Sequence, residues 1–291
     1  MKSEKNPQDK EIWVFLSHSN EDYEKVRRVR NMLEEQNLRP IMFFLKCLND
    51  DDEIDSLIKR EIDCRTRFIL CDSENARNSR WVQREIEYIE RQQKPYERID
   101  LSKSDAEIFA QLKEVRRKSK LFIAYSSRER KLASYVYTRL SKYDYDVFID
   151  FDRLLPGELY ARRIMTEIEG AVENGYIIAL FSEVGHDLQL VDKEVALARK
   201  YDREHGIKGG SVIPVVIDSH IPYICTDLNC IQFKNRTEDL PDKIVNAILK
   251  RLLAPGEILT YYRNFKNGIN SKVDFFESEQ LERLYRDICS E

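Results

Sequence analysis

The sequence predicts an α/β protein with two related domains, each a parallel β-sheet flanked by helices. Three observations predict this fold class. The chain of 291 residues is long enough for two domains of ordinary size. One pattern of residues occurs twice, and short apolar runs alternate with amphipathic helical runs throughout.

The chain repeats itself at a nearly constant offset. Phe15 and Phe122 lie in matching apolar runs that end in small polar residues, 107 positions apart. Glu85 and Glu194 each lie in the helical run after a third apolar run, 109 positions apart. Because the offset changes by only two residues across a whole domain, the pattern indicates a duplicated domain rather than chance similarity.

Strands and helices alternate in the same order in both halves. Buried parallel strands are predicted at 12–17, 40–45 and 68–71, and again at 120–125, 145–149 and 176–181. Helices are predicted between and after them, at 55–63 and 79–92, and at 158–173 and 187–203. This alternation is typical of a parallel sheet with flavodoxin-like strand order in each half.

The two halves differ in length after the third strand. The second half offers strands at 211–217 and 230–233 before a closing helix at 239–252. The first half offers only 96–101 before a closing helix at 104–116. The first domain is therefore predicted to be abridged by about one strand.

The domain plan follows from the repeat. We expect an N-terminal tail at 1–11, a first domain at 12–117, a second domain at 118–253 and a helical C-terminal tail at 254–291. The tail has helical spacing at Leu281, Leu284 and Ile288, and we expect it to pack on the second domain or on a partner.

Composition excludes several classes of function. A net charge of −4 gives no reason to expect nucleic-acid binding. No apolar run approaches the roughly 20 residues needed to span a bilayer, and the first ten residues do not resemble a secretory signal. The six cysteines form no CxxC pair, which favours reduced thiols and a cytoplasmic location.

The sequence predicts no metal site and no cofactor. The four histidines are scattered along the chain. The acidic run from Asp50 to Glu53 lacks EF-hand spacing, so we interpret it as a solvated loop.

Polar residues follow the first strand of each half, where a doubly wound sheet binds its ligands. They are Ser17, His18 and Ser19 in the first half, and Tyr125, Ser126 and Ser127 in the second. The helices after the third strands bring Glu85 and Glu194 towards the same edge, and Trp81 shares a helix face with Glu85. Such a carboxylate could stabilise positive charge at a ribose carbon. An ordinary glutamate near a helix start is the simpler interpretation of the residues alone.

Both halves resemble Toll/interleukin-1 receptor (TIR) domains. The first-strand motif of that family matches Phe15–His18 and Phe122–Tyr125. Its second-strand and BB-loop pattern matches 147–157, including Asp150 and Gly157, whereas 43–48 in the first half lacks both of these residues. The family's Ser-x-Trp-x-x-x-Glu helix is intact at Ser79, Trp81 and Glu85. The second half has Leu188 and Leu190 at the first two positions but keeps Glu194.

The resemblance implies a function. Enzymatic TIR domains cleave the nicotinamide–ribose bond of NAD⁺ with a helix glutamate, which assigns the catalytic role to Glu194 or Glu85, with a preference for Glu194. NAD⁺ is then the substrate, and no further cofactor is needed. The resemblance and the strand ends together predict these substrate-binding residues: Tyr125, Ser126, Ser127, Asp150, Gly157, Ser17, His18, Ser19 and Trp81.

The resemblance also extends to partners and context. It implies self-association through the TIR domains and a possible downstream effector protein, and it is greatest with bacterial TIR enzymes of antiphage defence. The product could be ADP-ribose or a cyclic form of it.

Two other functions are compatible with the fold order. A non-catalytic TIR scaffold would signal by self-association, and one half could be a pseudoenzyme that regulates the other. A phosphoacceptor receiver domain would need an acidic pair after the first strand and an aspartate ending the third. The third strands end at Asp72 and Ser182, which disfavours this reading, above all in the second half.

Overall fold

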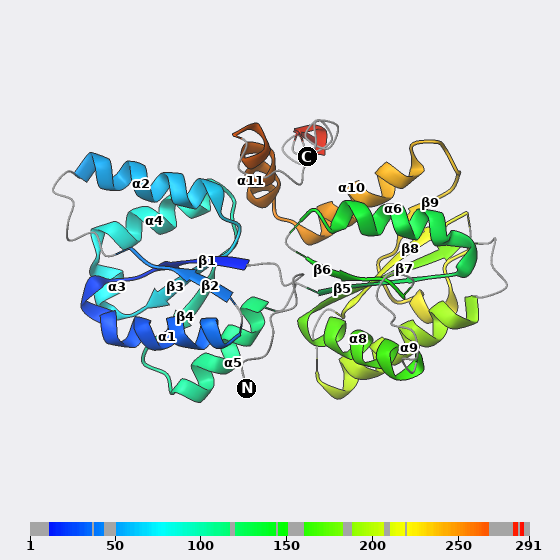
Figure 1. Cartoon of the computed structure of the whole chain (residues 1–291), viewed down its shortest axis with the longest axis horizontal. Helices are drawn as coiled ribbons and strands as arrows, with labels where there is room; N and C mark the ends of the chain where they lie inside the picture. Colours follow the sequence, from blue (N-terminus) through cyan, green and yellow to red (C-terminus); the bar gives the residue numbers. More distant parts are fainter. Residues whose placement is uncertain are drawn as a thin grey trace. The chain divides into compact units, whose positions relative to one another are not determined.

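The structure is a computed structural model of the 291-residue chain. It describes residues 12–36, 38–43, 51–116, 120–143, 145–150, 160–182, 188–206, 210–218, 220–267, 282–284 and 286–287. The chain divides into two compact units: residues 1–115 together with 253–291, and residues 116–252. Each unit is an α/β sandwich with a parallel sheet in the middle (Figure 1).

The first unit contains a four-stranded sheet in the order β2-β1-β3-β4. Its strands are β1 (Ile12–Ser17), β2 (Leu38–Ile41), β3 (Phe68–Asp72) and β4 (Glu97–Asp100). Its helices are α1 (Tyr23–Glu35), α2 (Asp51–Cys64), α3 (Glu74–Asn78), α4 (Arg80–Arg91), α5 (Asp105–Arg116) and α11 (Pro255–Lys266). Helices α1 and α5 cover one face of the sheet, and α2 and α4 cover the other (Figure 1). Apolar side chains that alternate along β1 and β3 fill both interfaces.

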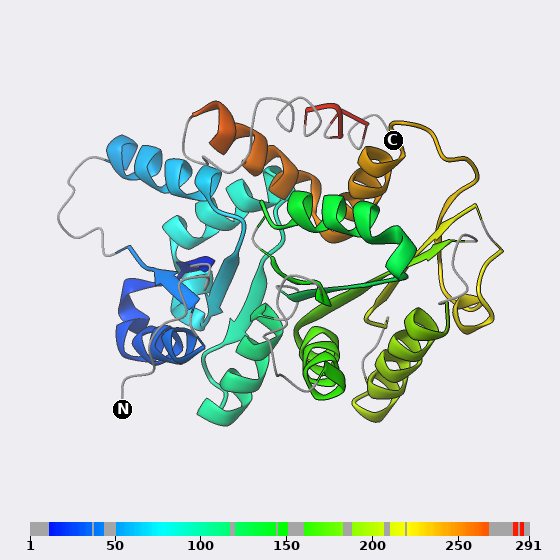
Figure 2. The same ribbon diagram turned by 45° about the vertical axis from the view of Figure 1, so that its right-hand side comes forward.

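The second unit contains a five-stranded sheet in the order β6-β5-β7-β8-β9. Its strands are β5 (Lys120–Tyr125), β6 (Asp146–Phe148), β7 (Gly175–Ser182), β8 (Val212–Ile217) and β9 (Ile231–Phe233). Its helices are α6 (Arg130–Leu140), α8 (Tyr160–Asn174), α9 (Leu188–Glu204) and α10 (Leu240–Leu252). Helices α8 and α9 pack on one face, and α6 and α10 on the other (Figure 2).

The predicted fold class is confirmed. Both sheets are parallel, both have the flavodoxin-like order, and the first has one strand fewer than the second among the described residues. The second strands are shorter than predicted and β2 begins earlier, at Leu38. The single helix expected at 79–92 is preceded by the short helix α3. Ser79 separates the two helices. Its backbone is extended, and its side chain accepts a hydrogen bond from the Val82 amide, which caps the start of α4.

The acidic run after Asp50 is helical, which corrects its interpretation as a loop. Asp51, Asp52 and Glu53 form the first turn of α2. Negative side chains there interact favourably with the amide dipoles of the helix start. Asp51 also pairs with Arg80 at the start of α4.

Helix α11 of the C-terminal segment packs on the first unit, whereas the expectation was packing on the second domain or on a partner. Helix α11 contacts α2, where Asn264 donates a 3.1 Å hydrogen bond to the Cys64 carbonyl and Arg263 lies 3.4 Å from Asp63. Ile258 is fully buried in this contact region. Apolar burial and capping of the α2 end together hold the helix in place. Of the residues with predicted helical spacing, Leu281 and Ile288 lie outside the described residues.

Two features are absent from the described residues. None of their helices is long and apolar enough to cross a membrane. In the same part of the chain, His, Cys, Asp and Glu side chains form no group of three that could hold a metal ion.

The start of α11 tests how the C-terminal segment is held. The Gly256 amide donates to the Gln93 carbonyl, and a Cβ on Gly256 would lie 2.0 Å from the Gln92 carbonyl oxygen. We expect Gly256→Ala to lower the unfolding free energy of the first unit by about 2 kcal/mol, because backbone must move to admit the methyl group. Chemical denaturation measures this. The control Asn264→Ala loses one hydrogen bond and should cost less. Equal stability of Gly256→Ala and the unmodified chain would contradict the contact.

Candidate functional site

A buried glutamate lies at the same place in each unit. Glu85 is on α4, which packs near the end of β1, and Glu194 is on α9, which packs near β5. Their exposed fractions are 8% and 7%. Both are far more buried than a glutamate on a solvated helix face, so the interpretation as ordinary surface residues is wrong.

In the first unit a serine holds the glutamate. The Ser17 hydroxyl, at the end of β1, donates a 2.5 Å hydrogen bond to Glu85 Oε2. Burial raises the pKa of Glu85 to about 7, although the hydrogen bond from Ser17 favours the charged form. The carboxyl group therefore has an internal partner.

In the second unit the corresponding residue has no hydroxyl. In the first sheet, Ser17 follows Leu16, which pairs with Ile69. In the second sheet, Ala124 pairs with Ala179. The strand registers therefore place Ala124 at the position of Ser17. No described residue donates a hydrogen bond to the Glu194 carboxyl. Burial raises the pKa of Glu194 to about 8, with a further contribution from the negative charge of nearby Asp150.

Two predicted residues meet beside this carboxyl. The Tyr125 hydroxyl, at the end of β5, donates a 2.5 Å hydrogen bond to Asp150 Oδ1 after β6. Since Asp150 acts electrostatically on Glu194, the structure brings these three residues into one neighbourhood. Ser126 follows Tyr125 and is buried, and its Oγ has no hydrogen-bond partner among the described residues. A buried hydroxyl without a protein partner is one that a ligand can satisfy.

The equivalent polar residues of the first unit serve the fold. The Ser19 side chain accepts a hydrogen bond from the Glu21 amide and begins a 3-10 turn. The His18 ring lies 3.0 Å from the Leu16 carbonyl, and burial lowers the pKa of His18. These contacts anchor the strand end.

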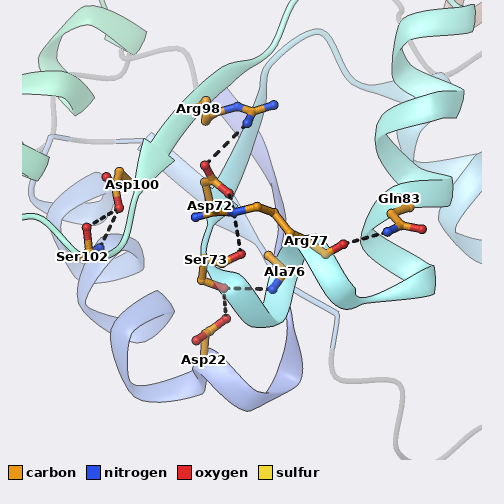
Figure 3. A network of polar contacts seen from close by, with 9 residues as sticks. All are labelled: Asp22, Asp72, Ser73, Ala76, Arg77, Gln83, Arg98, Asp100 and Ser102. Carbon is orange, nitrogen blue, oxygen red and sulfur yellow. Dashed lines mark hydrogen bonds and ion pairs between the residues drawn. The ribbon is translucent and has the colours of Figure 1, made fainter.

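Sequence reasoning missed an acid–serine pair in each unit. Ser73, after β3, donates to Asp22 in the turn after β1 (Figure 3). Ser182, at the end of β7, donates a 2.7 Å hydrogen bond to Glu129 in the turn after β5. Asp22 and Glu129 are 107 positions apart, as are the two first strands. The repeat therefore contained the signal, although neither acid belongs to a familiar motif.

Arg236 completes the pair in the second unit. It makes hydrogen bonds to Glu129 and to Asp218, at 2.5 and 2.8 Å. Burial alone would raise the pKa of Glu129, but its hydrogen bonds with Arg236 and Ser182 and the charge of Arg236 outweigh burial and lower it. In the first unit, Asn75 donates to Asp22 instead.

A cavity of about 720 Å³ opens where β5 ends and α6 begins. Its lining combines cations with hydroxyl groups: Ser127, Arg128, Arg130, Lys131 and Ser134. Positive side chains and the amides of a helix start both favour an anionic group.

A protein-family model described as TIR domain matches residues 14–102 and 121–248, which is more than half of the chain. The chain belongs to the TIR domain family. A search of curated proteins found no match. Two crystal structures of SsGBP mutation variants match at 15% and 14% identity, over 94% and 95% of this chain and 98% and 100% of theirs. Their TM-scores of 0.21 and 0.22 are too low to inform fold or function.

The aromatic residue of the first TIR domain has structural contacts. Trp81 packs against the apolar cluster between α2 and α4, and the guanidinium groups of Arg80 and Arg84 lie 5.2 and 5.4 Å from its ring centre. Its counterpart in the second TIR domain, Leu190, is 40% exposed. Trp81 therefore has a packing role in the first domain.

Part of the predicted site lies outside the described residues. Gly157 and the rest of the BB-loop pattern after Asp150 belong to it, as do residues 44–50 of the first TIR domain. Of the residues predicted for the second TIR domain, the structure describes Glu194, Asp150, Tyr125, Ser126 and Ser127, and Ser127 lines the cavity.

The raised pKa of Glu85 predicts a pH-dependent stability. The folded protein keeps this proton up to about pH 7, whereas a glutamate with the ordinary pKa of 4.5 loses it earlier. Unfolding therefore releases a proton between these values, and the contribution of Glu85 to stability falls as pH rises through this window. We expect Glu85→Gln, which can still accept from Ser17, to be more stable than the unmodified chain by about 1–3 kcal/mol at pH 8 and by much less at pH 4.5.

Urea denaturation at a series of pH values measures this difference. Glu87 lies two residues after Glu85 on α4 and is exposed. The control Glu87→Gln should therefore change stability little at any pH. A pH-independent difference for Glu85→Gln would show that its proton is not retained in the folded state.

Proposed function

We propose that the second TIR domain is an NAD⁺ glycohydrolase or cyclase, with Glu194 as its catalytic residue. One observation carries the choice of domain. Glu194 is buried near Asp150 and receives no hydrogen bond from any described residue. The carboxyl group of Glu85, by contrast, already accepts a hydrogen bond from Ser17. A carboxyl group without an internal partner can act on a substrate.

The reaction breaks the bond between the nicotinamide nitrogen and the ribose anomeric carbon. The bonding electron pair leaves with nicotinamide, which departs as a neutral base, and positive charge develops on the ribose. The Glu194 carboxylate stabilises this charge and holds a ribose hydroxyl. Water then adds to the carbon and releases its proton to give ADP-ribose. Attack by another nucleophilic atom of the same molecule gives a cyclic product instead.

The electrostatics of the site favour this chemistry. With a pKa near 8, Glu194 retains its proton in much of the free protein at pH 7. A nicotinamide ring that carries a positive charge favours the ionised carboxylate when it enters the same buried region. Substrate binding would thus create the charged form next to the carbon where positive charge develops.

Neighbouring residues supply binding groups. We assign the ribose hydroxyls to Asp150 and to the buried Ser126 hydroxyl, with Tyr125 orienting Asp150. The cationic cavity at Ser127 suits the diphosphate of NAD⁺.

The first TIR domain has a supporting role in this proposal. Its glutamate is held by Ser17, and Phe43 stands at the position that corresponds to Asp150 by the 107-residue offset. These features fit a pseudoenzyme that regulates the active domain. By resemblance to bacterial TIR enzymes, the product would serve as an immune signal.

A non-catalytic scaffold is the second candidate. The hydrogen bond from Ser17 to Glu85 favours a scaffold role for the first TIR domain. If both halves were scaffolds, self-association would occur without any turnover of NAD⁺.

Nicotinamide release from NAD⁺ tests the enzyme proposal. We expect Glu194→Gln to lower the rate at least about 100-fold, because the neutral amide cannot stabilise the positive charge. The matched variant Glu85→Gln should keep most of the activity. Chromatography of the products distinguishes ADP-ribose from a cyclic product. A self-associated but inactive unmodified chain would support the scaffold, and loss of activity only in Glu85→Gln would move the site to the first domain.

The single-atom difference between Ser17 and Ala124 gives a second test. We expect Ala124→Ser to donate a hydrogen bond to Glu194 and occupy it, which should lower kcat/KM about tenfold. The same bond should lower the pKa that governs kcat/KM from its starting value near 8. Ala171→Ser places the same oxygen in a buried position on α8 and should leave the pH profile unchanged. An unshifted profile in Ala124→Ser would contradict the assignment of Glu194.

A further inference from the structure

Among the residues that the structure describes, the sheet of the first domain has one strand fewer than that of the second. Its edge strand is β4, which pairs with β3. In the second domain, the equivalent strand β8 carries β9 on its outer side. Ile99 pairs with Cys71 in the first sheet, and Val215 pairs with Leu180 in the second. The strand registers therefore place Ile99 and Val215 at equivalent positions. Residues 99–101 therefore stand where residues 215–217 pair with 231–233 in the other domain.

The outer edge of β4 presents backbone amides to a partner, while its Asp100 carbonyl accepts a hydrogen bond from the Lys103 amide. The Leu101 amide donates to the Asp72 carbonyl. Since successive residues of a strand turn their backbone groups to opposite sides, the amides of Arg98 and Asp100 face away from β3. Only residues 101–104 separate β4 from α5, so this connection is too short to form another strand.

A cavity of about 260 Å³ lies beside this edge. It is formed by β3, α3, α4 and β4, and its lining residues are Leu70, Asp72, Ala76, Arg77, Val82, Gln83, Ile86, Glu87 and Arg98. The floor is apolar, since Leu70, Ala76 and Val82 form a small buried cluster.

The second domain shows what fills the equivalent place. Val82 and Ile86 correspond to Val191 and Val195 by the 109-residue offset. Those two valines belong to the same apolar cluster as Cys225, which is completely buried in the segment that leads to β9. The residues around Cys225 thus cover a face that the first domain leaves as a cavity.

Charge at the rim adds a preference. Arg77 and Arg98 both pair with Asp72, at 3.0 and 3.5 Å, and their side chains are 66% and 56% exposed (Figure 3). These two cations share the Asp72 carboxylate, and Glu87 is the second acid of the cavity lining. In the second domain, Arg199 donates a 2.8 Å hydrogen bond to Asp227 of the covering segment.

We propose that the β4 edge and the adjoining cavity bind an extended segment of another protein. The segment adds a fifth parallel strand to the sheet, inserts a small apolar side chain between β4 and α4, and places a carboxylate near Arg77 and Arg98. Backbone pairing supplies affinity, and the cavity and rim supply selectivity. This inference rests on the strand register and the duplication, and it holds whether or not the second domain turns over NAD⁺.

A peptide with the sequence of residues 221–234 is the probe, because this segment fills the equivalent place in the second domain. A fluorescent label on the peptide and a reducing buffer allow a titration with the full chain. We expect saturable binding that weakens with salt, because Asp227 of the peptide would pair with Arg77 or Arg98.

Two variants locate the binding. Arg98→Pro removes an outward amide, a change that an edge strand tolerates, and should weaken binding at least about tenfold. Gln83→Trp covers the cavity from an exposed position on α4 and should have a similar effect. The control Arg84→Trp places the same ring next to it, on a residue that does not line the cavity. Circular dichroism and thermal unfolding verify that all three variants are folded.

Three outcomes would overturn the inference. The first is the absence of binding to the unmodified chain at millimolar peptide. The second is equal binding to Gln83→Trp and Arg84→Trp. The third is dimerisation of the unmodified chain that both Arg98→Pro and Gln83→Trp abolish, which would make the occupant a second copy of this chain rather than a different protein.

Discussion

The hydrogen bond between a serine at the end of the third strand and an acid in the turn after the first strand underlies the geometry of both sites. Ser73 with Asp22, and Ser182 with Glu129, join two neighbouring strands at their carboxyl ends. A buried acid needs such a partner, because an unpaired carboxylate away from water is costly. The pairs connect the turns that follow β1 and β5 to the ends of β3 and β7.

On this shared scaffold, the two domains differ at the glutamate itself. A hydroxyl at Ser17 gives Glu85 an internal partner, whereas Ala124 leaves Glu194 without one and Asp150 adds a like charge. Burial raises the pKa of both carboxyl groups, so each weakens the fold at neutral pH. In the first domain Ser17 partly offsets that cost. In the second domain no described residue offsets the cost of burying Glu194. This is the situation expected where a substrate supplies the missing interaction.

Much of this arrangement could be predicted from the sequence. The offset between the halves and the alternation of apolar runs determine the strand order, and Glu85 and Glu194 follow from their place after the third strands. The acid–serine pairs could not be predicted in this way, because a residue such as Asp22 meets Ser73 only when the sheet has formed. The docking of α11 on the first unit depends on a close backbone approach at Gly256, which helical periodicity does not reveal. Predicting the short helix α3 would have required recognition of Ser73 as a helix cap ahead of the capping serine Ser79.

The difference in length between the halves has a consequence at the sheet edge. Loss of a terminal strand normally exposes a surface that invites unspecific pairing, and charged residues on the edge strand are a common protection. Glu97 and Arg98 are both exposed on β4, yet Ile99 remains buried and the apolar floor formed by Leu70 and Val82 persists beside them. Charge on the edge strand disfavours arbitrary partners, while the cavity rewards a segment with the right side chain in the right register. The abridged domain therefore keeps the features needed for selective recognition while its glutamate is engaged internally.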